Sequence, residues 1–362
     1  MVISTKEERP KSNECFFMNN FHVFFMDFFF FFTDKVSTLK DKKMSLLSQL
    51  KIKTNTKTPS EIEEFLKVSE EVILGKPQQV KLAFCCLLAK GNLLIEDVPG
   101  VGKTTLVKFL SRVLNLKESR IQFTNDLLPA DIIGTSIFDE NKKTFSFHQG
   151  PIFGQLIIAD ELNRATPKTQ SACLQAMEEH FVSVDGKNYE LPKPFFLIAT
   201  QNPKEQMGTY PLPESQLDRF LMRIEMGYPD REAEKMLLKG ERRVDVLDQL
   251  KPVMDSEDLI EFQNLVQKIY VSDQVIEYVQ DILDQSRSTA IEHYGLSPRC
   301  GIALIQCAKA WAFMHGRDMV LPEDIQSIGV SVMGHRLVRS DDMDSLRGLK
   351  IAEEILANVR VD

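Results

Sequence analysis

The chain has 362 residues, of which 43% are hydrophobic and 27% are charged, and its formal net charge at pH 7 is −8. This length allows two or three domains with ample core, and the charged fraction is that of an ordinary globular protein. Because the balance is acidic and shows no tract of Lys and Arg, the composition argues against nucleic-acid binding and agrees with a soluble cytoplasmic protein.

Residues 1–43 form a phenylalanine-rich leader that differs from the rest of the chain, with an unbroken phenylalanine run at 28–32. The apolar stretch at 22–32 is interrupted by Asp27 and is shorter than the roughly 20 residues of a membrane-spanning helix. It also lacks the small-residue cleavage site of a secretory signal. We therefore expect no membrane span, and a leader that is disordered or foreign to the native protein, with translation beginning near Met44.

A polar linker after Met44 leads to the first predicted helix, which starts at Pro59 and Ser60. A second helix is predicted from Pro77 to Ala89. Between the two helices lies Gly75, which is suited to cap the first of them. The sequence therefore predicts a joint between two helices just before the first strand.

Segment 93–104 has the pattern of a phosphate-binding loop. An apolar strand at 93–95 leads into the loop, and apolar residues at helical spacing follow it. Asp97 is the one mismatch to the consensus, which has glycine there, and Asp is among the few residues that accept a positive φ. Lys103 would neutralise the β- and γ-phosphates, and Thr104 would offer its hydroxyl to Mg²⁺. The alternative is a glycine-rich turn. The predicted nucleotide-binding residues of the loop are Pro99, Gly100, Val101, Gly102, Lys103, Thr104 and Thr105.

Two short strands are predicted at 135–138 and 144–148, around the polar turn 139–143. A second hairpin is predicted at 181–184 and 187–191, because Asp185 and Gly186 suit a tight type I′ turn. Between the hairpins, Thr166 and Pro167 mark a helix start. The alternative for both hairpins is a surface loop with only local stability.

Two further apolar runs end in polar side chains that suit nucleotide chemistry. The run 156–159 ends in Asp160 and Glu161, where an aspartate could hold Mg²⁺ and a glutamate could polarise the attacking water. The run 195–200 is followed by Asn202, which could orient that water at the carboxyl edge of a parallel sheet. The alternatives are an acidic strand end that caps the next helix, and a simple Asn-Pro turn.

The strand pattern ends near Asp230, and helical periodicity follows at 276–283, 300–313 and 325–332. We therefore predict an α/β core over 44–230 and an all-α lid domain over 231–362. The cysteines show neither a disulfide framework nor the spacing of a zinc site, and Cys85, Cys86 and Cys173 lie in apolar helical segments. They are predicted to be core thiols, and no site is predicted to hold a metal through them.

Several short blocks of the sequence occur together in one order along the chain. The blocks are 122–124, 126–129, 131–132, 150–153, 160–165, 167–168, 170–172, 177–179, 199–203, 217–220 and 295–299. With these blocks the chain resembles the MoxR group of AAA+ ATPases over roughly residues 60 to 340. The resemblance implies an AAA+ P-loop NTPase core, in which helices flank a parallel sheet, with a C-terminal helical lid and with ATP and Mg²⁺ as ligands.

The resemblance also implies roles for single residues. Arg219 resembles an arginine finger that reaches the nucleotide of the neighbouring subunit, with Arg164 as a second candidate, and Arg299 resembles the sensor 2 arginine of the lid. Arg219 could instead pair with an acidic residue of its own helix. Ile73 and Gly75 are candidates for the adenine site, with the simple helix joint as the alternative. Both hairpins resemble insertions that project towards a partner or substrate.

The resemblance implies an ATP hydrolase that works as a homo-oligomeric ring, a hexamer, with Glu161, Asn202, Arg219 and Arg299 in catalytic roles. It further implies chaperone-like remodelling or activation of partner proteins, including proteins with a von Willebrand factor A domain. Two other functions fit the same residues. One is a nucleic-acid-stimulated motor, and the other is a nucleotide-gated binding protein with negligible turnover.

Overall fold

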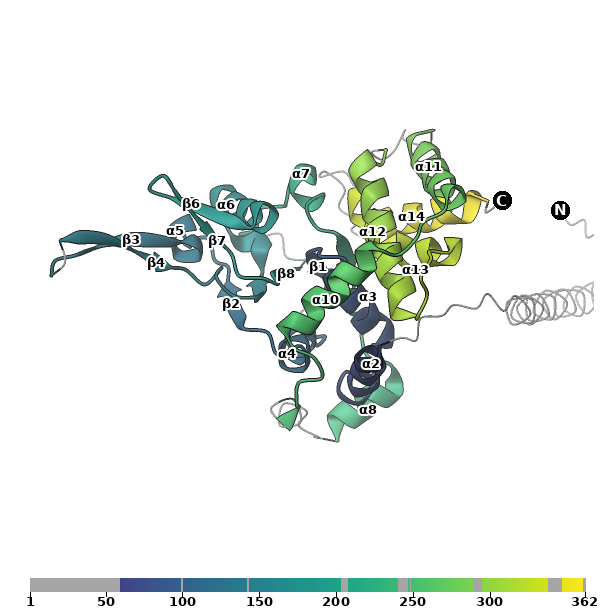
Figure 1. Cartoon of the computed structure of the whole chain (residues 1–362), viewed down its shortest axis with the longest axis horizontal. Helices are drawn as coiled ribbons and strands as arrows, with labels where there is room; N and C mark the ends of the chain where they lie inside the picture. The colour runs from purple at the N-terminus through teal and green to yellow at the C-terminus, as the bar shows by residue number, and fades with distance from the viewer. Residues whose placement is uncertain are drawn as a thin grey trace, which may run out of the picture. The chain divides into compact units, whose positions relative to one another are not determined.

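The structure is a computed structural model that describes residues 59–98, 100–141, 143–202, 208–239, 247, 249–288, 295–337 and 347–360. The leader at 1–43, the start near Met44, Pro99 and Cys15 lie outside these residues. Figure 1 shows the arrangement of the helices and strands. The described helices are α2 (Ser60–Val72), α3 (Pro77–Leu88), α4 (Lys103–Val113), α5 (Pro129–Ile133), α6 (Pro167–Glu179), α7 (Glu214–Leu217), α8 (Arg231–Leu238), α10 (Ser256–Gln267), α11 (Asp273–Ser288), α12 (Pro298–Met314), α13 (Pro322–Met333) and α14 (Arg347–Asn358).

The main sheet has five parallel strands in the order β2-β5-β8-β1-β9. The four strands from β5 to β9 are almost entirely buried, as expected for a parallel sheet with helices on both faces. This confirms the three apolar strands predicted from the sequence. The strands of this sheet are β1 (Leu93–Glu96), β2 (Glu118–Gln122), β5 (Leu156–Asp160), β8 (Phe196–Gln201) and β9 (Met222–Ile224).

Successive strand residues point to opposite faces of the sheet, so that two hydrophobic clusters form. Leu93 and Ile95 join the cluster that contains α2, α3 and α4, and Leu94 joins the cluster that contains α5 and α6. The first cluster continues into the helices that follow β9. The β1 strand is therefore anchored on both faces, which fixes the position of the loop that follows it.

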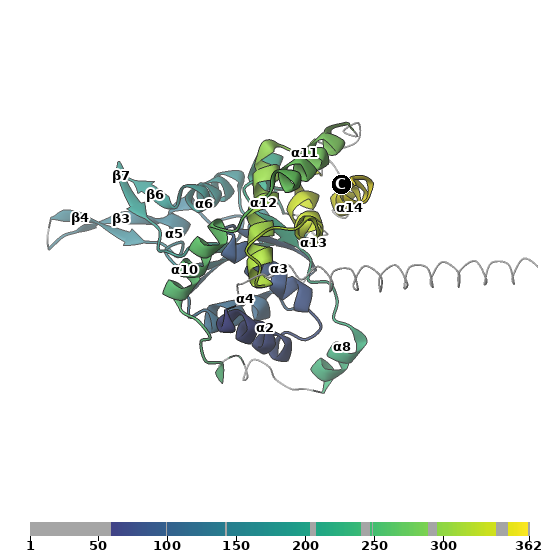
Figure 2. The same cartoon turned by 45° about the vertical axis from the view of Figure 1, so that its right-hand side comes forward.

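Two antiparallel hairpins lie outside the sheet, and they confirm the predicted strand pairs. They are β3 (Gly134–Asp139) with β4 (Thr144–Gln149), and β6 (Phe181–Val184) with β7 (Lys187–Glu190). Asp185 and Gly186 have φ of 52° and 75°, which is the type I′ turn that the sequence predicts. The hairpins lie side by side in Figures 1 and 2, and the rings of Phe147 and Tyr189 stack between them with centroids 4.0 Å apart.

The described chain beyond β9 is helical, in agreement with the predicted lid. The α12 helix starts at Pro298, where Oγ of Ser297 accepts a hydrogen bond from the N–H of Cys300. Because the core around α3 runs on into α12, the division at residue 230 stays a proposal. Among the residues described, no helix is both long and apolar enough to cross a membrane.

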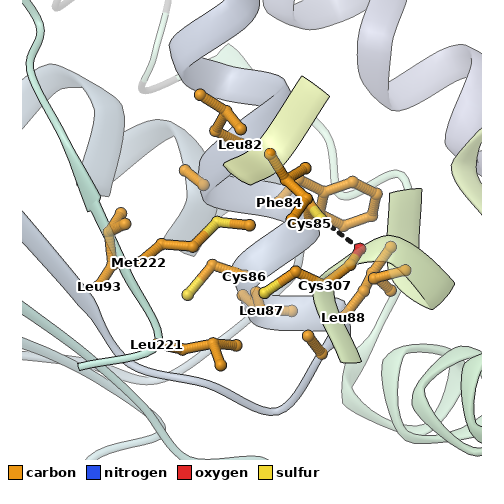
Figure 3. Packing of buried hydrophobic residues seen from close by; sticks show 14 of the residues in the cluster. Leu82, Phe84, Cys85, Cys86, Leu87, Leu88, Leu93, Leu221, Met222 and Cys307 are labelled. Carbon is orange, nitrogen blue, oxygen red and sulfur yellow. Dashed lines mark hydrogen bonds between the residues drawn. The ribbon is translucent and has the colours of Figure 1, made fainter. Parts of the chain in front are cut away.

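The described cysteines are buried, as the sequence predicts for core thiols. Figure 3 shows α3 packed against α12, where Sγ of Cys85 donates to the carbonyl oxygen of Cys307 at 3.3 Å. Burial raises the pKa of Cys173 to about 12 and that of Cys300 to about 11. These thiols therefore stay protonated at neutral pH, and they fill the two hydrophobic clusters, Cys300 the one that includes α12 and Cys173 the one that includes α6.

A buried ion pair links the end of β1, directly before the loop, to the neighbouring strand β9. Nε of Arg223 on β9 lies 2.5 Å from Oε2 of Glu96 at the end of β1, and Nη2 of Arg223 lies 2.6 Å from Oε1 of Glu225. Only 2% of the Arg223 side chain is exposed, and Gln201 also donates to Glu96. Burial raises the pKa of the Glu96 carboxyl, and Arg223 opposes this rise.

Replacing Arg223 with Met should lower the free energy of unfolding by about 3 to 5 kcal/mol, because it leaves a buried carboxylate without its cation. Without Arg223 the pKa of Glu96 rises further. A carboxyl group whose pKa is higher in the folded than in the unfolded protein stabilises the folded state at low pH, and this stabilisation is lost as the pH rises through the folded-state pKa. The loss of unfolding free energy in Arg223→Met should therefore be larger at pH 8 than at pH 6. Urea denaturation at both pH values measures this loss of unfolding free energy. The control Arg120→Met, on the exposed edge strand, should lower the free energy of unfolding by less than about 1 kcal/mol. An equal loss in both variants would contradict a stabilising role of the buried pair.

Candidate functional site

The loop after β1 has the backbone of a phosphate cradle. Gly100 and Gly102 have φ of 85° and 95°, which favours glycine, and an added Cβ at either position would meet no atom within 4 Å. Helix α4 begins directly after, at Lys103, so its positive end points to the open space over the loop. Thr104 is exposed and Thr105 half-buried in its first turn. The described residues of the loop therefore fit a bound triphosphate.

The role of Asp97 in the structure is that of a hydrogen-bond acceptor, and not that of a residue that tolerates a positive φ. It is not among the residues with positive φ, so the expectation that it is tolerated for that reason is wrong. Its carboxylate accepts from the N–H of Val98 at 2.7 Å and from the N–H of Gly227 at 2.5 Å. Asp97 thus ties the first residue of the loop to the segment after β9.

Lys103 lies over the loop, and its Nζ donates to the carbonyl oxygen of Asp97 at 2.8 Å. Burial lowers the pKa of Lys103 below that of an ordinary lysine, and the charges of Asp97, Asp160 and Glu161 oppose this shift. The ammonium group is therefore near enough to both strand ends to interact with their carboxylates. It could exchange its carbonyl contact for phosphate oxygens.

Asp160 ends β5, next to β8 in the sheet. Its Oδ1 accepts from Oγ1 of Thr200 at 2.6 Å, and its Oδ2 lies 2.6 Å from Nη2 of Arg120 on β2. The carboxylate is thereby held at the same edge as the loop. A carboxylate oxygen and the hydroxyl of Thr104 are donors of the kind that Mg²⁺ prefers, and their part in holding the ion stays a prediction.

Glu161 has φ of 56° and ψ of 48°, which is uncommon for a residue with a side chain. The conformation is held in place by a hydrogen bond from its N–H to Oγ1 of Thr200 at 3.0 Å. Its Oε2 accepts from Nε2 of Gln122 at 3.1 Å and lies 3.1 Å from Nε of Arg164. Arg164 is thus a partner of Glu161 in its own chain.

Asn202 follows β8, which lies between β5 and β1 in the sheet. Because all three strands are parallel, their carboxyl ends meet at one edge. Asn202 is half-buried at this edge, where the sequence predicts it, and the strand order places it between the loop and the pair Asp160 and Glu161. Its role in orienting water stays a prediction.

The sequence reasoning did not assign roles to the partners of the two carboxylates. Thr200 holds both Asp160 and the backbone of Glu161, and Arg120 and Gln122 contact them from β2. Arg120 and Gln122 are two residues apart on a strand, which places them on the same face. The spacing of Arg120 and Gln122, in a chain with a second strand that ends in Asp160 and Glu161, could have indicated that they contact these carboxylates.

Ile73 and Gly75 form the predicted joint between α2 and α3. Ile73 is buried in the core, and Gly75 has φ of 67°. A Cβ on Gly75 would lie 3.2 Å from the side chains of Ala233 and Asp230, so the joint packs closely against the start of α8. This segment lies near Gly227, to which Asp97 is bound, because Nζ of Lys76 donates to the carbonyl of Tyr228 at 2.5 Å. Contact with adenine stays a prediction for both residues.

Arg219 and Arg299 lie together, in a separate cluster. Nη1 of Arg219 lies 3.1 Å from Oε2 of Glu178, and Nη2 of Arg299 lies 2.7 Å from Oε1 of the same carboxylate. The ion pair of Arg219 is thus with Glu178 on α6 and not with its own helix. We name this group, with Asp218 and Arg336, the arginine cluster.

The nearly buried Arg336 anchors the arginine cluster. Its Nε lies 2.7 Å from Oδ1 of Asp218, and its Nη2 donates to the carbonyl oxygen of Phe220 at 2.7 Å. The other oxygen of Asp218 lies 3.5 Å from Nη1 of Arg299. Asp218 therefore joins the segment before β9 to α12 and to the short 3-10 helix Gly334–Arg336 after α13.

The arginine cluster lies at the amino end of the sheet. Its residues line one cavity with Asn92, which directly precedes β1. The phosphate loop starts at Asp97, after β1. Asn92 and Asp97 flank this four-residue strand, so at about 3.3 Å per residue they are about 16 Å apart. Arg219 and Arg299 thus lie towards the opposite end of the strands from the loop of their own chain.

Two family models match the chain. Residues 92–222 match the ATPase family associated with various cellular activities (AAA), and residues 284–357 match the AAA lid domain. The first match runs from Asn92 to the start of β9 and so includes the phosphate loop, both strand-end carboxylates and Arg219. The second includes Arg299.

Relatives cover most of the chain. It is 44% identical to the uncharacterised protein YeaC of Bacillus subtilis, over 80% of this chain and 91% of that protein. It is 38% identical to Chaperone MoxR1 of Mycobacterium tuberculosis, over 75% of this chain and 74% of that protein. The crystal structure of a provisionally assigned ATPase from Cytophaga hutchinsonii is similar with a TM-score of 0.74 and 36% identity, over 84% of this chain and 95% of that chain.

Proposed function

This chain belongs to the MoxR family of AAA+ ATPases, and we propose that it binds and hydrolyses ATP at the carboxyl edge of its sheet. One observation carries the proposal. The strand order β5-β8-β1 brings Asp160 and Glu161, Asn202, and the loop with Lys103 to the same edge.

Each of these residues has a defined part in the proposed reaction. The loop N–H groups and Lys103 would hold the phosphates, and Thr104 and Asp160 would hold Mg²⁺, whose positive charge would offset that of the phosphate oxygens. Glu161 takes a proton from the attacking water, and Asn202 orients that water. Because Glu161 is paired with Arg164 and Gln122, it must leave these partners to reach the water.

We also propose that the site is completed by a second copy of the chain, in a ring that the family resemblance predicts to be a hexamer. Arg219 and Arg299 line a cavity with Asn92 before β1, whereas their own loop follows β1, and Arg164 lies 3.1 Å from Glu161 of its own chain. This supports Arg219, and not Arg164, as the arginine that acts between subunits. It further suggests that Arg299 serves the neighbour's nucleotide together with Arg219.

The chaperone-like role is proposed from the relative named Chaperone MoxR1 and from the β3–β4 hairpin. Its side chains Ile137, Phe138 and Phe145 are 49%, 48% and 73% exposed, and the two phenylalanine rings contact each other. An exposed apolar tip of this kind favours contact with a partner protein. Partners with a von Willebrand factor A domain, which the resemblance implies, are the first to examine.

The experiment that tests the proposal measures ATP hydrolysis per subunit over a wide range of protein concentration, with sedimentation under the same conditions. Because the neighbour supplies two arginines, the rate per subunit should rise with concentration and level off as the oligomer saturates. Hydrolysis at a constant rate per subunit by a monomer would contradict the shared site. The absence of hydrolysis at every concentration would contradict the enzymatic function.

A further inference from the structure

We propose that Glu178 is a positioning residue, which holds Arg219 and Arg299 as a pair and presents them together to the nucleotide of the neighbouring subunit. The inference rests on the proposed function, in which these two arginines complete the neighbour's site. It adds a residue that acts through the two arginines and not on the phosphates themselves.

The geometry of one carboxylate carries the inference. Oε2 of Glu178 binds Arg219 at 3.1 Å and Oε1 binds Arg299 at 2.7 Å. Arg219 belongs to the segment before β9, and Arg299 belongs to the first turn of α12. Two guanidinium groups so close together repel each other unless an anion lies between them. Glu178 is that anion, and it fixes their spacing.

The arginines keep donors for a ligand while Glu178 holds them. A guanidinium group carries five N–H donors, and the ion pairs described here engage Nη1 of Arg219 and both Nη atoms of Arg299. The side chains are 29% and 53% exposed, and they line a cavity of about 340 Å³. A phosphate could therefore bind both arginines without displacing Glu178.

The frame around the arginine cluster is rigid. Asp218 lies near Nη1 of Arg299, whereas Glu178 binds Nη2, and Asp218 is itself held by Arg336, whose side chain is only 5% exposed. Only Glu178 bridges Arg219 to Arg299 among the ion pairs of the described residues. Removal of its charge should therefore separate the two arginines and leave the rest of the cluster in place.

Helix α6 also connects Glu178 to the catalytic edge of its own chain. The helix starts at Pro167, shortly after Arg164 with its ion pair to Glu161, and Glu178 lies in its last turn. Its 13 residues span about 20 Å at 1.5 Å per residue. Glu178 therefore lies about one helix length from the ion pair of Arg164 with Glu161 in its own chain.

The first test compares Glu178→Gln with Glu179→Gln. Glu179 is the adjacent residue, is exposed, and accepts only from Gln175 of its own helix among the contacts described. The Glu178 variant should lower kcat for ATP hydrolysis about tenfold, with less than a twofold change in KM, and the Glu179 variant should change neither. Oligomer mass and the unfolding midpoint should stay as in the wild type. A kcat at or above the wild-type value in Glu178→Gln, or loss of assembly, would overturn the positioning role.

The second test uses mixed oligomers, purified through different tags on the two kinds of subunit. Glu178→Gln subunits have an intact ATP site, and Lys103→Ala subunits have an intact arginine pair. If Glu178 acts on the neighbour, the mixture should hydrolyse ATP several-fold faster than the sum of the two variants alone. A mixture no faster than that sum would overturn the inference.

The same mixing with Arg219→Ala in place of Glu178→Gln separates two kinds of failure. Recovery with the arginine variant but not with the Glu178 variant would leave the shared site standing and reject Glu178 as its positioning residue. Failure of both mixtures would reject the action of Arg219 on its neighbour, and with it the premise of the inference.

Discussion

Replacing Lys103 with Ala should lower the affinity for ATP about 100-fold and reduce hydrolysis to background. The Nζ atom lies over the loop carbonyl of Asp97 at 2.8 Å, in a half-buried position where a hydrogen bond from a charged donor is worth up to about 3 kcal/mol. That energy corresponds to about 100-fold in affinity. Titration calorimetry with ATP and Mg²⁺ measures the loss directly.

The matched control is Lys108→Ala. Lys108 lies on the same helix α4 but is exposed and outside the loop, so its removal should change ATP affinity less than threefold. The free energy of unfolding should stay within about 1 kcal/mol of the wild type for both variants, since neither lysine belongs to a buried ion pair in the described structure. Equal ATP affinity in Lys103→Ala and the wild type would reject the loop as the phosphate site.

The lowered pKa of Lys103 adds a dependence on pH to the same measurement. Its ammonium group loses its proton at a lower pH than that of an exposed lysine, because burial disfavours the charged form. ATP affinity should therefore decline as the pH rises through that lowered pKa. In Lys103→Ala this decline should be absent.

Replacing Glu161 with Gln should reduce ATP hydrolysis by about 10² to 10⁴-fold while ATP remains bound. A general base contributes about that much to a rate, and the phosphate loop is untouched by the change. Gln is nearly the same size as Glu and still accepts from Gln122, but it cannot form the ion pair with Arg164. Single-turnover hydrolysis and ATP titration measure the two effects separately.

The control for this change is Glu118→Gln, at the exposed start of the edge strand β2, which should leave hydrolysis unchanged. A Glu161→Gln variant that hydrolyses ATP at the wild-type rate would remove Glu161 from the reaction. The same variant tests whether ATP hydrolysis is needed for partner release. If Glu161→Gln binds a partner protein in the presence of ATP and then releases it at the normal rate, ATP binding is sufficient and hydrolysis at most sets the duration of the bound state.

Much of the fold follows from local patterns in the sequence. Strands such as β5 and β8 are continuous apolar runs, because a parallel sheet covered on both faces needs them. The hairpin at Asp185 and Gly186 follows from the positive φ that its turn requires. The starts of α6 and α12 follow from Pro in the first helical position. These signals act over a few residues, so they can be read without knowing the rest of the chain.

The edge that gathers the candidate catalytic residues was also predictable, because side chains that follow parallel strands meet at one end of a sheet. Lys103, Asp160, Glu161 and Asn202 were each expected there. Which strand lies between which was not predictable, since it depends on long-range pairing. The structure gives β8 the place between β5 and β1, and so gives Asn202 its place between the loop and the carboxylates.

The loop, the three apolar strands, the two hairpins and the helices after residue 230 could all be predicted from local patterns, because each is set by neighbours along the chain. The edge strands β2 and β9, and the partners of the charged side chains, became known from the folded structure alone. Asp97 binds the distant N–H of Gly227, Arg120 pairs with Asp160, and Glu178 joins Arg219 to Arg299. An ion pair forms only when two charged groups lie within a few ångströms of each other in the fold, and the sequence separation of two residues does not give that distance.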